Sequence, residues 1–268
     1  MKNKFGLSRH VPEGIKRQLR QEAHFGCVVC GNALIIFEHL SDYVDVKSHN
    51  PEAMVCICAG CHDKVTRGIW TKEKILEAKQ NPKAKQVGYS NDFFDAGKEN
   101  LSVCFGKMLM KDVVTHLRIL DRPVFWISPP KQDNPYVGIN AVLRNDDGEV
   151  VLEIVENEWR TNSINWDAKV EGKILTFRDK KEQLVLKIRL LPRKEFNIEY
   201  MKMYSDGFLI MFDNNIFSVT APNWKASSDN GGMLDGCEVG FQIVEDGLKV
   251  GYNCRSMSFS DLRFNLLQ

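Results

Sequence analysis

The sequence predicts an α+β protein in which a small N-terminal metal-binding domain with flanking helices is followed by a mostly antiparallel β domain. Two observations lead to this prediction: residues 25–68 concentrate cysteine and histidine at metal-binding spacings, and the residues after 101 alternate between apolar and polar. The chain has 268 residues, of which 43% are hydrophobic and 26% charged, as is ordinary for a globular protein of one large or two modest domains. We expect domains at residues 1–90 and 101–268, joined by a linker at residues 91–100.

Four cysteines in two C-x-x-C pairs form the strongest signal in the chain. The pairs are Cys27 with Cys30 and Cys58 with Cys61. A two-residue spacer lets both sulfurs of a pair turn toward one ion, and four thiolates suit tetrahedral Zn²⁺. A redox dithiol and buried free cysteines are the alternatives, but the recurrence of the pair within one short segment favours structural zinc. Cys56 has no such partner, and we expect it to pack in the core.

The residues between the two pairs predict a strand, a polar loop and a second strand, followed by a helix. Residues 34–37 and 54–58 are short apolar runs, and the first of them ends at Glu38 and His39. Residues 62–67 fit a short helix. Zinc would clamp this hairpin and helix at their base, so that the end of the first strand and the start of the helix face each other.

Three side chains on these elements suit hydrolytic chemistry. The unperturbed pKa of histidine is about 6.5, so His39 can be neutral at cellular pH and take a proton from water. Glu38 and His62, on neighbouring elements, can hold a hard divalent ion that keeps open positions for phosphate oxygens. A general base, a metal ion and a zinc-braced frame are together what phosphodiester hydrolysis requires.

This arrangement resembles an HNH endonuclease of the zinc-braced ββα-metal type. The resemblance covers residues 1–90 and consists of C-x-x-C, a strand ending in Glu-His, and C-x-x-C-H followed by Lys and Arg. It implies that His39 is the general base, that Glu38 and His62 bind the catalytic Mg²⁺ or Mn²⁺, and that the four cysteines bind structural Zn²⁺. Two cations resemble the family's residues that hold the scissile phosphate, with ordinary surface cations as the alternative: Lys64 and Arg67.

One position departs from the pattern of the family. The family's middle asparagine, which orients the base histidine, corresponds here to Ala53. His49 and Asn50 in the preceding loop are candidates for that role. The resemblance implies a metal-dependent DNA endonuclease whose β domain serves targeting, assembly or regulation. A zinc-dependent nucleic-acid-binding protein without cleavage is one alternative, and a protein-interaction adaptor is another.

Helices are predicted on both sides of the metal-binding segment. Pro12 suits the first turn of one helix, and Thr71 can cap a second helix over residues 72–80. The cations of the first helix can approach a phosphate backbone or form a solvated face. Trp70, just before the second helix, can stack on a base or pack between helices. We expect no regular structure in residues 1–10.

Charge and cysteine usage limit the expected partners and compartment. The net charge is +1, but residues 1–90 carry 14 Lys and Arg against 9 Asp and Glu. A phosphate-binding face should therefore belong to the N-terminal part, with DNA as the expected partner and RNA as an open alternative. No apolar run of membrane-spanning length is present, so we expect a cytoplasmic protein away from membranes, in which oligomers are possible. The layout resembles a restriction or defence effector by analogy only.

The sequence of the second domain points to no chemistry. Apolar residues alternate at 137–143, 150–154 and 184–190, with turn signals between these runs. Such runs predict an all-β domain, as a sandwich or barrel in preference to a β-solenoid. We expect Trp159 and Trp166 to be core anchors, with a ligand site as the alternative. Other isolated residues of this domain are expected to be buried, the cysteines as free thiols: Cys104, His116, Cys237 and Cys254.

Overall fold

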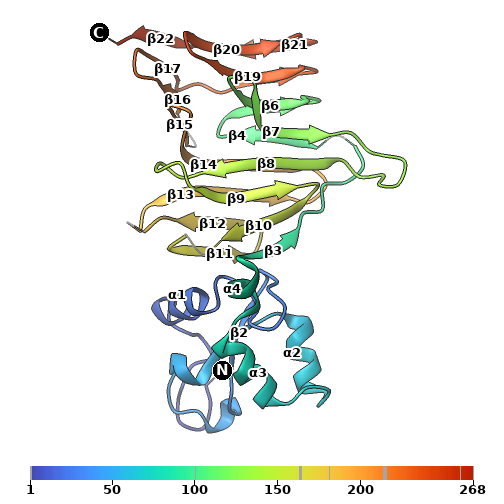
Figure 1. Ribbon diagram of the computed structural model, residues 1–268, viewed down its shortest axis with the longest axis vertical. Coiled ribbons are helices and arrows are strands. Elements are labelled where there is room, and N and C mark those ends of the chain that lie inside the picture. Colours follow the sequence, from blue (N-terminus) through green and yellow to red (C-terminus); the bar gives the residue numbers. More distant parts are fainter. Residues whose placement is uncertain are drawn as a thin grey trace. The chain divides into compact units, whose positions relative to one another are not determined.

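The computed structural model describes residues 2–99, 101–162, 165–180, 182–213, 216–259 and 261–267. The chain forms two compact units (Figure 1). The first unit comprises Met1–Asp92 and Arg160–Val170, and the second comprises Phe93–Trp159 and Glu171–Gln268. The predicted linker at residues 91–100 thus begins inside a strand, and its last residue, Asn100, lies outside the described residues. The return of the chain to the first unit at residue 160 was not predicted.

The first unit contains the helices of the described chain. Thr71 caps α3 as predicted, because its hydroxyl accepts a hydrogen bond from the backbone N–H of Lys74 at 3.3 Å. Cys58 caps α2 in the same way, with its sulfur 3.4 Å from the backbone nitrogen of Cys61. Leu19 of α1 is buried against the core of the unit. The α-helices and 3₁₀ turns are α1 (Glu13–Glu22), η1 (Tyr43–Asp45), η2 (Pro51–Ala53), α2 (Ala59–Thr66), α3 (Lys72–Gln80) and α4 (Lys83–Val87).

Two short strands run between the cysteine pairs. Strands β1 (Ile36–His39) and β2 (Met54–Ile57) are antiparallel, with Glu38 opposite Val55 and His39 opposite Met54. All four residues of β2 are buried, and Cys56 is 1% exposed, which confirms its predicted place in the core. Because β2 is buried, its pairing with β1 fixes the position of Glu38 and His39 at the end of β1.

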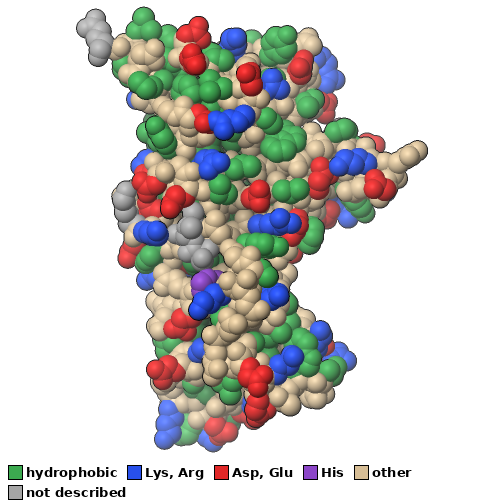
Figure 2. All heavy atoms as spheres, viewed as in Figure 1, with side chains coloured by type: hydrophobic (Ala, Val, Ile, Leu, Met, Phe, Trp, Pro, Cys, Tyr) green, Lys and Arg blue, Asp and Glu red, His purple; other side chains and the backbone are tan. Residues whose placement is uncertain are grey.

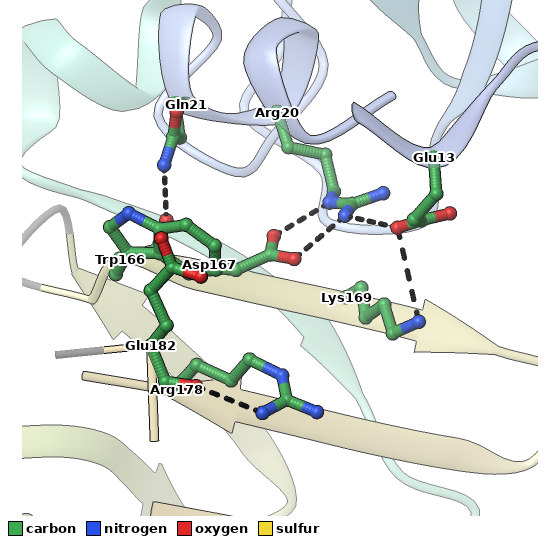
Figure 3. A network of polar contacts seen from close by, with 8 residues as sticks. All are labelled: Glu13, Arg20, Gln21, Trp166, Asp167, Lys169, Arg178 and Glu182. Carbon is green, nitrogen blue, oxygen red and sulfur yellow. Dashed lines mark hydrogen bonds and ion pairs between the residues drawn. The ribbon is translucent and has the colours of Figure 1, made fainter. Parts of the chain in front are cut away.

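A buried ion pair joins α1 to the segment Arg160–Val170 within the first unit (Figure 3). Arg20 donates two hydrogen bonds to the Asp167 carboxylate, each of 2.7 Å, and a third to Glu13, also of 2.7 Å. Gln21 donates to the backbone carbonyl of Trp166. The guanidinium of Arg17 lies 4.2 Å from the centre of the Trp166 ring, so Trp166 is not the core anchor that was expected.

One sheet lies mainly in the second unit. Its eight strands have the order β20-β19-β6-β7-β8-β9-β10-β3. The alternation at residues 137–143 and 150–154 predicted β8 and β9 closely. The strands are β3 (Tyr89–Phe93), β6 (Thr115–Ile119), β7 (Arg122–Ser128), β8 (Gly138–Arg144), β9 (Val150–Val155), β10 (Glu158–Asn162), β19 (Val239–Val244) and β20 (Gly247–Tyr252).

The other sheet has twelve strands, and β14 is its central element. The main order is β21-β18-β5-β4-β14-β15-β16-β17-β22, and β11, β12 and β13 continue from β14. Figure 1 shows β20, β21 and β22 at one end of this unit. The strands are β4 (Ser102–Phe105), β5 (Met108–Lys111), β11 (Asp167–Glu171), β12 (Ile174–Arg178), β13 (Leu184–Leu191), β14 (Glu195–Ser205), β15 (Phe208–Phe212), β16 (Phe217–Thr220), β17 (Trp224–Ser228), β18 (Gly232–Asp235), β21 (Ser256–Phe259) and β22 (Arg263–Leu266).

The predicted fold class, α+β with an N-terminal ββα-metal domain and a mostly antiparallel β domain, is wrong. Strands make up 47% of the chain and helices 15%, and the strands build large mixed sheets. Strand β4 pairs in parallel with β14, β5 with β18, and β6 with β19. Among the described residues no separate ββα domain is evident, because β1 and β2 lie in a unit with further helices and a returning segment. Periodicity reveals strands but not the direction of a distant partner.

Aromatic side chains fill the core of the second unit. Phe105 packs edge-to-face on Phe125, and Trp159 stacks on Phe94 as a core anchor. His116 is 1% exposed, as expected, and burial lowers its pKa to about 3. Cys104 is a buried free thiol. The prediction of free thiols was wrong for two other cysteines, which form a disulfide: Cys237 and Cys254.

Surface charge is mixed, in agreement with the net charge of +1. Figure 2 shows cationic and anionic side chains interspersed over the face in view. No helix among the described residues is long and apolar enough to cross a membrane.

Candidate metal centre and adjoining pocket

The four cysteines of the two C-x-x-C pairs come together in the first unit. Their Sγ atoms all lie within 4.8 Å of one another, and those of Cys30 and Cys58 are 3.6 Å apart. Four thiolates at about 2.3 Å from a tetrahedral zinc ion are about 3.8 Å apart. The cluster therefore has the composition and spacing to hold a metal ion such as zinc. Cys27 and Cys61 are buried, whereas Cys30 is exposed.

The pKa values of two cluster cysteines also favour the binding of a cation. A hydrogen bond from the Cys30 thiol, together with bonds from backbone N–H groups, lowers the pKa of Cys27 to about 5. Burial raises the pKa of Cys61 to about 12. The Cys27 sulfur thus ionises readily, while a positive ion would be needed to remove the proton from Cys61.

A pocket of about 560 Å³ lies in the same unit, between β1, the following loop, α2 and α3. Glu38 and His39 enter it from the end of β1, and His62 enters it from the first turns of α2. His62 directly follows Cys61, a member of the four-cysteine cluster, in α2. The other polar residues that line it are Arg9, Ser41, Asp42, Tyr43, Thr66 and Lys72, and the rest of the lining is apolar.

Glu38 and His62 form a half-exposed pair at this pocket. The Glu38 Oε2 and His62 Nε2 atoms are 3.6 Å apart, and the two side chains are 42% and 36% exposed. Because ligand oxygens and nitrogens lie about 2.1 Å from a small divalent ion, one ion can contact both atoms at this separation. Their exposure leaves room for further ligands from solvent or substrate.

His39 is held by a second histidine. Its Nε2 lies 3.2 Å from Nδ1 of His49, and Nε2 of His49 lies 2.9 Å from the backbone oxygen of Ser8. A carbonyl oxygen only accepts, so His49 must donate from Nε2, and in the neutral ring its Nδ1 is then an acceptor. His39 therefore donates from Nε2 and keeps Nδ1 as its basic nitrogen. Burial and the neighbouring His49 lower the pKa of His39, which favours the neutral base.

Residues 2–10 form no helix or strand, but they pack on the loop after β1. The Asn3 amide donates to the backbone oxygens of Tyr43 and Val46, at 2.9 and 2.6 Å. The Tyr43 hydroxyl donates to the backbone oxygen of Leu7 at 2.6 Å. The guanidinium of Arg9 then lies 4.8 Å from the centre of the Tyr43 ring. This packing places a cation at the pocket.

Comparisons with protein-family models, curated proteins and solved structures found no match.

Lys64 and Arg67, the predicted phosphate-binding residues, do not line the pocket. The ammonium of Lys64 lies over the ring of Trp70, and Arg67 forms an ion pair with Asp63 at 2.8 Å. Residues three and four positions apart share one face of a helix, so Val65 and Thr66 follow His62 into the pocket. The two cations lie two and five positions after His62, on other faces.

Arg9 and Lys72 were missed as site residues. Lys72 is the first residue of α3, and its ammonium contacts Asp42 at 3.0 Å. Nothing in the local pattern marks Arg9, because its position depends on how the N-terminal segment packs on a loop more than thirty residues away. His49 was named only as a candidate partner of His39. The other candidate, Asn50, instead caps η2 through the backbone N–H of Glu52.

Proposed function

We propose that the pocket is the active site of an HNH-type endonuclease that hydrolyses phosphodiester bonds in DNA with a divalent metal ion. The observation that supports this most is the convergence of Glu38, His39 and His62 on one pocket, with the first and third 3.6 Å apart. A carboxylate and an imidazole that can share an ion, beside a neutral histidine, are suited to the activation of water against a phosphate.

In this proposal each residue has one task. His39 accepts a proton from the attacking water at Nδ1, while His49 holds Nε2. The bond from the water oxygen to phosphorus forms as the bond from phosphorus to the leaving oxygen breaks, and the leaving oxygen takes a proton from solvent. Glu38 and His62 would hold Mg²⁺ or Mn²⁺, which when bound polarises the phosphate and stabilises developing negative charge. Arg9 neutralises a phosphate oxygen from the wall of the pocket.

The four-cysteine cluster would hold structural zinc and position the site. Cys58 is both a member of the cluster and the N-cap of α2, and His62 follows Cys61 in the same helix. Loss of the ion would release the start of α2 and so move His62 away from Glu38. A firmly held frame matters because small displacements of catalytic groups cost orders of magnitude in rate.

The test is a cleavage assay with the full chain on plasmid, linear duplex and single-stranded DNA, with Mg²⁺ or Mn²⁺ added. His39→Ala should lower the cleavage rate by roughly 10²- to 10⁴-fold, the usual contribution of a positioned general base. Zinc content should stay the same as in the wild-type protein. His10→Ala is the matched control, because His10 is an exposed histidine that does not line the pocket.

Two experimental outcomes would contradict this proposal. If the protein binds DNA in a salt-dependent way but cleaves it with no divalent metal, the nucleic-acid-binding protein without cleavage is favoured. Ala53 in place of the family's asparagine would then prevent catalysis in spite of the contact between His49 and His39. An equal cleavage rate in wild type and His39→Ala would remove His39 from the role of base.

A further inference from the structure

Two aromatic rings with lysines over them belong to segments that contribute residues to the pocket. The Trp70 ring lies between α2 and α3, with the ammonium groups of Lys64 and Lys74 at 4.4 and 5.1 Å from its centre. Trp70 packs against the core of the first unit but is only partly buried. Neither lysine forms an ion pair with another described residue, so both charges are available to an anion. Ile69, next to the ring, is 66% exposed.

The second ring is in the N-terminal segment. Phe5 is 50% exposed, and the ammonium groups of Lys4 and Lys47 lie 5.2 and 5.5 Å from its centre. Lys4 also pairs with Asp45, but both of these side chains are more than half exposed, and an exposed pair is weak and easily exchanged for a phosphate. Phe5 is thus an exposed apolar ring with cations around it.

Both rings belong to segments that also line the pocket. Thr66 and Lys72, which flank Trp70 in the sequence, line it from α2 and α3. Arg9 lines it from the segment that carries Phe5, and Val44 lines it from the loop that carries Lys47. The two rings therefore belong to separate segments, and each of these segments contributes residues to the pocket.

Nucleic acid is the ligand that matches this composition. Bases stack on aromatic side chains regardless of sequence, and lysines beside the ring can contact the flanking phosphates. In a continuous duplex the faces of each base are covered by its neighbours, so such rings are used only by unpaired or extruded bases. A surface that reads duplex DNA would instead need side chains that reach base edges in a groove.

We propose that the site takes an unpaired strand of nucleic acid, with bases stacked on Trp70 and on Phe5 and the strand crossing the pocket between them. This rests on the proposed function only in taking the pocket as the place of the scissile phosphate. The chemistry is shared by single-stranded DNA and RNA, so the substrate class is an unpaired strand, and the experiment separates the two.

The experiment measures binding of fluorescent oligonucleotides to the full chain carrying His39→Ala, without added divalent metal. The probes are one sequence as single-stranded DNA, as duplex DNA and as single-stranded RNA. We expect the single strands to bind more tightly than the duplex. Trp70→Ala and Phe5→Ala should each weaken single-strand binding roughly 5- to 100-fold, the range that base stacking supplies, with little change for the duplex.

A matched control is present in the second unit. Tyr136 is 40% exposed, and the ammonium of Lys98 lies 5.9 Å from the centre of its ring, so Tyr136→Ala removes a similar aromatic and lysine pair far from any pocket-lining segment in the sequence. It should leave binding unchanged. Trp70→Phe keeps a ring and should restore most of the binding, which separates stacking from a folding defect.

A second measurement covers the case in which Trp70→Ala loses its fold. In this measurement a single abasic nucleotide is placed at successive positions along the DNA strand. With the wild-type protein it should weaken binding at two positions, those of the bases that stack on Trp70 and Phe5. With Trp70→Phe the size of the loss should change at one of these two positions. Duplex binding as tight as single-strand binding, or abasic scans without a sensitive position, would overturn the proposal. Tight single-strand binding without cleavage in the separate assay would refute the endonuclease and leave this inference standing.

Discussion

Removal of the Asp167 carboxylate should destabilise the first unit strongly. Arg20 and Asp167 have side chains that are 4% and 6% exposed, and two hydrogen bonds of 2.7 Å join them (Figure 3). In Asp167→Ala the guanidinium stays buried with only Glu13 as a partner. Because an uncompensated buried charge costs about 3–5 kcal/mol, we expect a loss of that size in the free energy of unfolding of this unit.

Two control variants test whether the loss comes from the buried, unpaired charge of Arg20 and not from the loss of one polar contact. Glu13→Gln removes another partner of the same guanidinium, but the Glu13 side chain is 48% exposed, so the loss should be at most about 1 kcal/mol. The double variant Arg20→Met with Asp167→Leu removes both charges and replaces them with apolar volume. It should recover most of the stability that Asp167→Ala loses.

The assay is denaturant unfolding followed by the helical circular-dichroism signal, because the helices of the described chain belong to the first unit. Equilibrium in both directions would be checked before a free energy is taken. The reasoning would be refuted if Asp167→Ala lost less than about 1 kcal/mol, or if the double variant were less stable than the single one.

Three further predictions concern the pocket and the second unit. Arg9→Ala should lower kcat/KM for DNA cleavage roughly 10- to 100-fold, as expected for the loss of one charge-assisted contact. Arg67 pairs with Asp63 in the wild-type protein, so Arg67→Ala should change kcat/KM by no more than about twofold. Equal effects of the two substitutions would contradict the role given to Arg9. The folded pKa of His116, about 3, lies below its unfolded value of about 6.5, so stability should be full above pH 6.5 and fall by up to about 5 kcal/mol as pH drops toward 3. His116→Phe should remove this slope, and an unchanged pH dependence of unfolding would argue against it. The disulfide closes a loop of 17 residues, so Cys237→Ser with Cys254→Ser should cost the second unit about 3 kcal/mol in denaturant unfolding under oxidising conditions; no change there would mean that the bond is not formed in solution.

Local features of the sequence predicted much of the first unit at the level of single elements. Thr71 marks the start of α3 because its hydroxyl competes for a free backbone N–H, which is a property of neighbouring residues. The C-x-x-C spacing likewise places two sulfurs near one point without knowledge of the fold. These signals extend over a few residues, and the structure follows them.

Long-range arrangement could not be predicted in the same way. Arg20 and Asp167 are 147 residues apart, and neither has a local pattern that names the other. Strand β14 pairs in parallel with β4, with Glu195 opposite Ser102, and alternation carries no information about direction. The fold class was therefore mistaken, although the alternating runs at residues 137–143, 150–154 and 184–190 were recognised as strands.

The candidate site shows the same limit on a smaller scale. Glu38, His39 and His62 were predicted from their place on the expected strand and helix and from the resemblance to HNH endonucleases, and all three line one pocket. Lys64 was assigned to the phosphate because it is close to His62 in sequence, but two positions along a helix turn a side chain to another face. Arg9 reaches the pocket only through the packing of its segment on Tyr43.

Chemical rescue of His39 tests the central proposal most directly. The measurement is the cleavage rate of plasmid DNA by His39→Gly with Mn²⁺, in the absence and presence of added imidazole. We expect the wild-type protein to cut, His39→Gly to lose activity roughly 10²- to 10⁴-fold, and imidazole to restore part of it by supplying the missing base. Wild-type activity in His39→Gly without imidazole, or no cleavage by the wild-type protein with any divalent ion, would contradict the account.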